Sequence, residues 1–141
     1  MLSPVVDIEF YGNRFYNKPD VAETRRQLQS LLDKLEEHYG VKPLIYATES
    51  SYSTYIRGAF DGYPLWIRNV YFSPNMGMPG KWTFWQYDSE ATLQGYSGEE
   101  EHIDLNVFYG SEEEWIKFLE NYSVSGTKDT TMIQNSEKRI K

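Results

Sequence analysis

The chain has 141 residues, of which 40% are hydrophobic and 16% aromatic, and this is enough apolar material for one domain with its own core. Its 21 acidic residues outnumber its 14 basic residues, and the net charge of -7 argues against a nucleic-acid backbone or an anionic membrane as the main partner. The sequence contains no cysteine, which excludes disulfides, thiolate metal sites and a cysteine nucleophile.

The first predicted element is a strand over residues 4–10, an apolar run that contains two carboxylates. Side chains alternate along a strand, so Asp7 and Glu9 point to one face, while Val6 and Ile8 point to the other. Two acids on one face of a buried strand either line a cleft or carry a large desolvation penalty. Such a pair is what glycoside hydrolysis uses, whereas the alternative is a strand that ends in a solvated loop with both acids merely exposed.

A helix is predicted over about residues 19–39. Pro19 suits the first helical turn, and Gly40 is a natural stop. Between them, apolar side chains recur at helical spacing at Leu28, Leu31, Leu32, Leu35 and Tyr39. Strands follow at residues 44–47 and 64–70, and Thr48 can cap a short helix that runs from the first of them to about Arg57.

The second half of the chain is predicted to contain strands at residues 82–87 and 102–108, with a polar loop or hairpin at residues 89–101 between them. Ser111 and Glu114 form a capping-box pattern that opens a helix to about Asn121. Residues 123–141 are polar without apolar periodicity and are interpreted as a flexible or loosely packed tail. This order of elements predicts the α/β fold class, and the continuous apolar strands suit a sheet buried on both faces.

Several polar or amphipathic side chains fall at the carboxyl ends of the predicted strands. They are Asp7 and Glu9, then Tyr46, Trp66, Gln86 and Asp88. In parallel α/β folds this end of the sheet carries the active site, which favours a functional Asp7/Glu9 pair. Taken alone, Tyr46 and Trp66 are each explained by core packing, and Asp88 is equally well explained as a turn residue before Ser89.

Asp104 lies in an apolar context, and a buried aspartate needs a partner. It could be a further acid of the site or could simply pair with an arginine. No spacing of His, Asp and Glu makes a convincing metal site, and no Walker loop, GxGxxG or GxSxG motif is present. We therefore expect neither a metal nor a cofactor.

Five segments occur in an order that resembles the glycoside hydrolase family 25 lysozymes, which are N-acetylmuramidases of bacteria and phages. The segments are Pro-Val-Val-Asp-Ile-Glu (4–9), Leu-Ile-Tyr-Ala-Thr (44–48), Leu-Trp-Ile (65–67), Trp-Thr-Phe-Trp-Gln-Tyr-Asp-Ser (82–89) and Ile-Asp-Leu-Asn-Val-Phe-Tyr-Gly (103–110). A lone Asp-x-Glu is a weak signal, whereas five motifs in register over about residues 4–121 are a specific one.

The resemblance implies cleavage of the β-1,4 bond between N-acetylmuramic acid and N-acetylglucosamine in peptidoglycan. By this analogy Glu9 matches the general acid, and Asp7 matches the neighbouring carboxylate that orients or stabilises. Cleft positions that hold substrate or tune the acids are matched by Tyr46, Trp66, Gln86 and Asp104, and Asp88 is added to the expected substrate-binding set. A covalent intermediate and assistance by the substrate's acetamido group both remain open.

Family members usually carry several more β/α units before the Asp-x-Glu strand. A complete barrel of this type needs roughly 200 residues or more, and this chain offers about 120 before the tail. We therefore expect residues 1–122 to be the C-terminal part of the catalytic domain, folded as an incomplete (β/α) TIM-like barrel without its N-terminal units. Its first strand would then expose an edge that pairs with a second copy or leaves the barrel open.

The resemblance further implies that peptidoglycan glycan strands are the partner and that the protein is secreted or associated with the cell wall. No signal peptide is visible at the start, and no apolar run is long enough to span a bilayer. Two other functions stay open: a non-catalytic peptidoglycan-binding or carbohydrate-binding remnant, and a structural or interaction role for a degenerate fragment.

Overall fold

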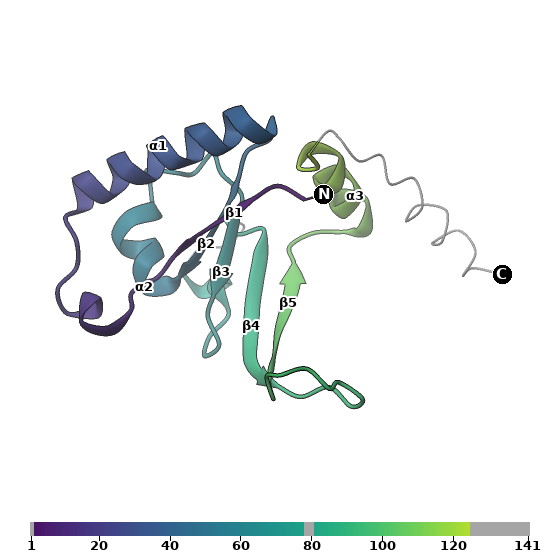
Figure 1. Cartoon of the computed structure of the whole chain (residues 1–141). Helices are drawn as coiled ribbons and strands as arrows, with labels where there is room; N and C mark the ends of the chain where they lie inside the picture. The colour runs from purple at the N-terminus through teal and green to yellow at the C-terminus, as the bar shows by residue number, and fades with distance from the viewer. Residues whose placement is uncertain (1, 78–80, 125–141) are drawn as a thin grey trace.

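The computed structural model describes residues 2–77 and 81–124, which form a mixed α/β fold around a five-stranded sheet of order β1-β2-β3-β4-β5 (Figure 1). The strands are β1 (Val5–Ile8), β2 (Leu44–Thr48), β3 (Leu65–Arg68), β4 (Phe84–Ala91) and β5 (Ile103–Phe108). Strands β1 to β4 run parallel, and β5 returns antiparallel to β4. The α/β prediction is therefore confirmed. Within the described residues, no helix combines the length and the apolar character that crossing a membrane requires.

Helix α1 (Val21–Tyr39) begins two residues later than predicted. The side chain of Asp20 accepts a hydrogen bond from the backbone N–H of Glu23 at 2.8 Å, so Asp20 is the N-cap and Pro19 lies before the helix. Gly40 ends the helix with a left-handed φ of 72°, a conformation that glycine adopts without a Cβ penalty. The predicted body and end of the helix are confirmed.

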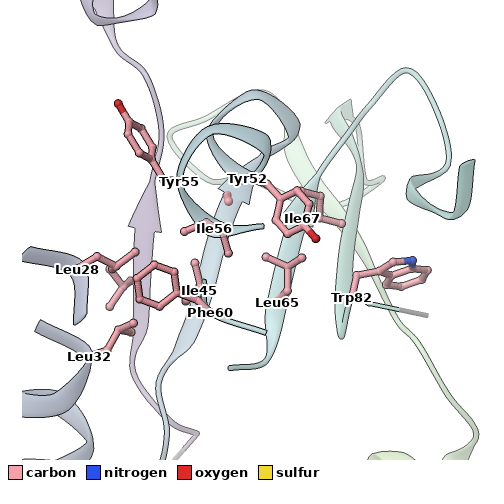
Figure 2. Packing of buried hydrophobic residues seen from close by; sticks show 12 residues of the cluster. Leu28, Leu32, Ile45, Tyr52, Tyr55, Ile56, Phe60, Leu65, Ile67 and Trp82 are labelled. Atoms are coloured by element: carbon pink, nitrogen blue, oxygen red, sulfur yellow. The ribbon is translucent and has the colours of Figure 1, made fainter. Parts of the chain in front are cut away.

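One face of the sheet carries the core. Buried side chains of the strands, among them Ile45 and Ile67, belong to one hydrophobic cluster with Leu28 and Leu32 of α1 (Figure 2). The rest of the cover comes from α2 (Glu49–Ser51), which Thr48 caps as predicted, and from the π-helical turn Tyr52–Ile56 that continues it.

The expectation of a sheet buried on both faces is wrong. On the second face Asp7 is exposed, and Tyr46 and Trp66 are half-buried. The reason is that α1, α2 and the Tyr52–Ile56 turn all cover the first face, so alternation along the strands leaves the part of the second face around Asp7 open to solvent.

Strand β3 ends at Arg68, two residues before the predicted end. The Oδ1 atom of Asn69 accepts hydrogen bonds from the backbone N–H groups of Tyr71 and Phe72, at 3.1 and 3.0 Å. This local turn competes with the extended strand and terminates it.

Strand β4 begins two residues later than predicted and continues to Ala91, into the segment predicted as a polar loop. The extension exists because β5 supplies an antiparallel partner, with register shifts between Gln86 and Asp88 and again between Asp88 and Ala91. Cross-strand pairing therefore decides this boundary, and local propensity does not.

Helix α3 (Glu112–Asn121) has the predicted capping box, with Ser111 and Glu114 bonded reciprocally. It packs on the second face of the sheet through Phe118, whose ring lies 5.3 Å from that of Phe84. The backbone N–H of Ser3 donates to the carbonyl of Tyr122 at 2.8 Å, so the start of the chain lies beside the end of α3 (Figure 1). The predicted tail, residues 123–141, lies outside the described residues from residue 125 onward.

Candidate active site

The parallel register places the predicted site residues on the second face of the sheet. Asp7 pairs with Tyr46, and Tyr46 pairs with Trp66, so the three side chains form a row across β1, β2 and β3. Paired residues of neighbouring strands share a face, and that face is opposite the core.

A second row follows two residues closer to the carboxyl ends of the parallel strands. It consists of Thr48, Arg68, Gln86 and Asn106, from β2 to β5. Glu9 comes directly after β1, and two-residue alternation puts it on the same side as Asp7. The structure therefore brings Asp7, Glu9, Tyr46, Trp66 and Gln86 together, as the sequence predicted.

Asp7 and Glu9 lie at the β1 edge of the sheet, and the charge of Glu9 acts on Asp7. Asp7 is exposed as a whole residue, yet loss of water around its carboxyl group raises its pKa above the ordinary value, and the negative charge of Glu9 raises it further. The two carboxylates are thus close enough for one to favour protonation of the other. That coupling is typical of carboxylate pairs that handle protons.

The phenol of Tyr11 is a third member of this group. Its hydroxyl donates a hydrogen bond to Oε2 of Glu9. This hydrogen bond, followed by the negative charges of Glu9 and Asp7, raises the pKa of Tyr11 to about 12. Tyr11 is consequently a protonated donor at neutral pH.

Tyr46 and Gln86 form the buried floor of the site. The Tyr46 hydroxyl donates to Oε1 of Gln86 at 2.6 Å, and Gln86 is only 3% exposed. Burial, followed by the negative charge of Glu9, raises the pKa of Tyr46 above its ordinary value. The phenol is therefore a neutral hydrogen-bonding group beside the two acids.

Trp66 stands edge-on to Tyr46, with ring centroids 5.3 Å apart, and its Nε1–H donates to Oδ1 of Asn106 at 2.9 Å. The Tyr46 hydroxyl and the Trp66 indole N–H are therefore both hydrogen-bonded to other side chains, and these bonds hold the two rings in place. Such flat surfaces with fixed polar edges are suited to sugar rings, which stack on aromatic faces and hydrogen-bond at their rims.

Asp104 and Asp88 lie in different surroundings. Asp104 shares the face of Asn106, two residues away on β5, but it is exposed because β5 is the edge strand of the described sheet. It needs no buried partner, contrary to what its apolar context suggested. Asp88 pairs with Leu105, which alternates with Asn106 and faces the other side, and its Oδ1 accepts the backbone N–H of Glu90 at 2.8 Å. The β-bulge thus separates Asp88 from the rest of the predicted set.

Sequence reasoning missed Tyr11, Arg68 and Asn106. Each lies two residues after a residue that it did select, namely Glu9, Trp66 and Asp104. Side chains two positions apart on a strand share a face, so extending the search by two residues from each selected residue would have identified all three.

In the part of the chain that the structure describes, Asp7 and Glu9 belong to no metal-binding cluster and line neither of two hollows near the sheet. In residues 2–77 and 81–124 no cluster of three or more His, Cys, Asp or Glu could hold a metal ion. A cavity of about 520 Å³, lined in part by Leu65, Trp82 and Tyr122, contains neither Asp7 nor Glu9. A second hollow of about 490 Å³ includes Ser89 and Asp104 and borders the site. The acids themselves lie on an open face.

The sequence matches the profile of the family described as Glycosyl hydrolases family 25 over residues 1–96. Among curated proteins, it is 34% identical to the uncharacterized protein YegX of Escherichia coli K12 over 128 residues. That match covers 89% of this chain and 42% of YegX, so the chain spans less than half the length of this relative.

Solved structures of a family 25 glycosyl hydrolase and of a bacterial lysozyme have folds similar to that of this chain. The family 25 glycosyl hydrolase of Bacillus anthracis has a TM-score of 0.74 and 45% identity, and the match covers 82% of this chain and 54% of that one. The bacterial lysozyme of Streptomyces coelicolor has a TM-score of 0.66 and 26% identity, with 84% of this chain and 56% of that one covered. The chain therefore corresponds to a little over half of each hydrolase chain.

Proposed function

Because the chain belongs to glycosyl hydrolase family 25, we propose that it acts as a lysozyme-type hydrolase that cleaves the β-1,4 bond between N-acetylmuramic acid and N-acetylglucosamine in peptidoglycan. The observation that supports this most directly is the grouping of Asp7 and Glu9 beside Tyr46, Trp66 and Gln86 on one face of the sheet. Two acids next to an aromatic pair provide both the proton chemistry and a surface for sugar rings.

In this proposal Glu9 is the general acid, which protonates the glycosidic oxygen as the bond breaks. Tyr11 occupies one carboxyl oxygen of Glu9, Oε2, so the other oxygen is the one available to the leaving group. Asp7 supplies negative charge next to the sugar carbon, where positive charge develops in the oxocarbenium-like transition state. Both a covalent intermediate on Asp7 and acetamido assistance oriented by Asp7 are compatible with these roles.

Tyr46, Trp66, Gln86 and Asp104 form the proposed substrate-binding set. The hydroxyl of Tyr46 is bonded to Gln86, so the pair fixes the floor on which a sugar ring rests. The exposed carboxylate of Asp104 is free to accept hydrogen bonds from sugar hydroxyls. Asp88 is not retained in this set, because the bulge pairs it with Leu105 and its carboxylate is bonded to the Glu90 N–H.

We further propose that residues 1–122 belong to a catalytic domain built as an incomplete (β/α) barrel. In the described residues β1 and β5 are the two edges of an open sheet, as expected if further strands complete the structure. One source of such strands is a second copy of the chain, in a homodimer through the edge of β1. The proposal also places the protein outside the cell or at the cell wall, where peptidoglycan lies.

Release of reducing sugar from purified peptidoglycan tests the hydrolase. We expect activity from the chain, and its loss in Glu9→Gln with an unchanged circular dichroism spectrum. Glu37→Gln, an exposed carboxylate on the outer side of α1, is the matched control and should retain activity. Near-normal release by Glu9→Gln would remove Glu9 from the mechanism.

A non-catalytic peptidoglycan-binding remnant is the second candidate. It is favoured by the open second face, on which Asp7 and Asp104 are both exposed and no element of the described chain covers the acids. Pull-down with insoluble cell walls separates the two functions. Wall binding without any release of reducing sugar supports the remnant and contradicts the hydrolase.

A further inference from the structure

Arg68 introduces a positive charge into an otherwise acidic face. It is the last residue of β3, with Thr48 and Gln86 as its cross-strand neighbours, and it shares the face of Trp66 two residues earlier. The residue as a whole is half-buried.

The described residues give Arg68 no carboxylate partner. Its one hydrogen bond in the structure runs from a terminal nitrogen to Oγ of Ser89 at 3.1 Å. No carboxylate oxygen of residues 2–77 and 81–124 lies within 4.0 Å of it, and the ion pair of the described chain joins Arg26 and Glu23. A guanidinium has five N–H donors, so most of its bonding capacity is unused by these residues.

The surroundings of Arg68 are acidic at longer range. Besides burial, the charges that act on the Tyr46 phenol are those of Glu9, Arg68, Asp7 and Asp104, and Arg68 is the one that opposes the other three. A substrate that carries a negative charge would be repelled by these acids unless a cation compensates. Arg68 is placed to provide that compensation.

The chemistry of the proposed substrate supplies the matching group. N-acetylmuramic acid differs from N-acetylglucosamine by an ether-linked lactyl group that ends in a carboxyl, and in intact peptidoglycan this carboxyl carries a stem peptide with carboxylates of its own. Guanidinium and carboxylate form paired, charge-assisted hydrogen bonds, and a planar fork recognises this shape better than an ammonium does.

We propose that Arg68 is a specificity residue that binds a carboxylate of the muramyl unit and thereby distinguishes muramyl glycans from plain N-acetylglucosamine chains. The inference rests on the proposed function and names the substrate group that this part of the site reads.

Binding measurements by calorimetry in the Glu9→Gln background, where the glycan is not turned over, test this role. The ligands are a tetramer of N-acetylglucosamine, a peptide-free alternating tetrasaccharide with free lactyl carboxylates, its amidated form, and the same glycan with stem peptides. Arg68→Gln is compared with Arg68→Lys, and Arg26→Gln is the control that removes the same charge from the outer face of α1.

Arg68→Gln should weaken binding of a carboxylate-bearing glycan about tenfold, equivalent to about 1.4 kcal/mol, and change binding of the N-acetylglucosamine tetramer by no more than about twofold. If Arg68→Gln loses affinity only for the peptide-free glycan, the lactyl carboxylate is the group that Arg68 binds. If it loses affinity only for the peptide-bearing glycan, that group is a carboxylate of the stem peptide. The affinity of Arg68→Lys for the carboxylate-bearing glycan should lie between that of Arg68→Gln and that of the parent, because lysine keeps the positive charge but lacks the planar set of N–H donors.

An equal loss for all four glycans overturns the proposal, because Arg68 would then only balance the acids. If the parent chain binds none of the glycans, both this inference and the proposed function fail. If the chain releases reducing sugar from peptidoglycan and Arg68→Gln binds the glycans as the parent does, only the role of Arg68 fails. Should Arg68→Gln prove unfolded by circular dichroism, the Arg68→Lys comparison between charged and amidated glycans decides in the same way.

Discussion

The hydroxyl of Tyr11 donates a hydrogen bond to Oε2 of Glu9, two residues earlier in the chain. The backbone at Tyr11 is extended, with φ -113° and ψ 142°, so the two side chains project to the same side. Tyr11 is 68% exposed, which means that the hydrogen bond forms at the open edge of the sheet where a substrate would approach. One carboxyl oxygen of the proposed general acid is thus held by its own chain.

The first prediction concerns the ionisation of Tyr11. In Glu9→Gln the pKa of Tyr11 should fall from about 12 toward the ordinary value of 10.0, because the hydrogen bond to the Glu9 carboxylate is weakened and the negative charge of that carboxylate is removed. Titration of ¹³Cζ-labelled tyrosine by NMR measures this directly. Glu37→Gln serves as the control and should leave the Tyr11 titration in place. An unshifted Tyr11 in Glu9→Gln would show that the two groups do not interact in solution.

The second prediction concerns the pH dependence of stability through Asp7. Its pKa is raised in the folded state, so folding is favoured by its protonated form, and this contribution is lost as the pH rises through the folded pKa. Asp7→Asn should therefore raise the melting temperature at pH 7. The gain should disappear at pH 3, below the unfolded value of 3.8, where Asp7 is protonated in both states. Thermal unfolding followed by circular dichroism at both pH values checks the sign, and a gain of equal size at pH 3 would contradict it.

The third prediction concerns the hydrogen bond between Tyr46 and Gln86. Tyr46→Phe should lower the free energy of unfolding by about 1–3 kcal/mol, because the buried Oε1 of Gln86 loses its donor. Tyr16→Phe, at a residue 85% exposed, should change it by no more than about 0.5 kcal/mol. Urea unfolding measures the free energy of unfolding of both variants. If the cause is the unsatisfied Gln86, the double variant Tyr46→Phe/Gln86→Leu will lose less stability than the sum of the two single changes.

The fourth prediction concerns the edge of β1. If a second copy pairs with this edge, Val5→Lys should shift the chain from dimer to monomer, because a lysine at an exposed edge opposes strand pairing. Val5 is 45% exposed, and Val107 on β5, the opposite edge, is 41% exposed, so Val107→Lys is a closely matched control. Sedimentation velocity over a range of protein concentrations distinguishes dimer from monomer for each variant. A wild-type chain that is monomeric at every concentration would rule out the edge dimer.

Several features of this fold follow from local sequence, and these are the ones that were predicted correctly. The leucine periodicity of α1, the Gly40 stop, and the Thr48 and Ser111 caps are interactions within a few residues of one another. The placement of Asp7 and Glu9 on one side of β1 also follows from alternation alone.

Element boundaries that depend on partners were predicted less well. Strand β4 reaches Ala91 only because β5 pairs with it, and the register shifts in that pair turn Asp88 away from Gln86. Strand β3 ends at Arg68 because the side-chain oxygen of Asn69 accepts hydrogen bonds from the backbone N–H groups of Tyr71 and Phe72.

For the candidate site, local sequence is sufficient to predict which side chains share a face of each strand, because alternation is a property of one chain segment. The carboxyl ends of the predicted strands, together with the family resemblance, identified the candidates Asp7, Glu9, Tyr46, Trp66, Gln86, Asp88 and Asp104. Which of these side chains contact one another follows from the folded sheet, because contact depends on the register between strands that are far apart in the chain. The Tyr46–Gln86 and Trp66–Asn106 hydrogen bonds each join residues 40 positions apart, and the open part of the second face around Asp7 arises because α1 packs on the other side.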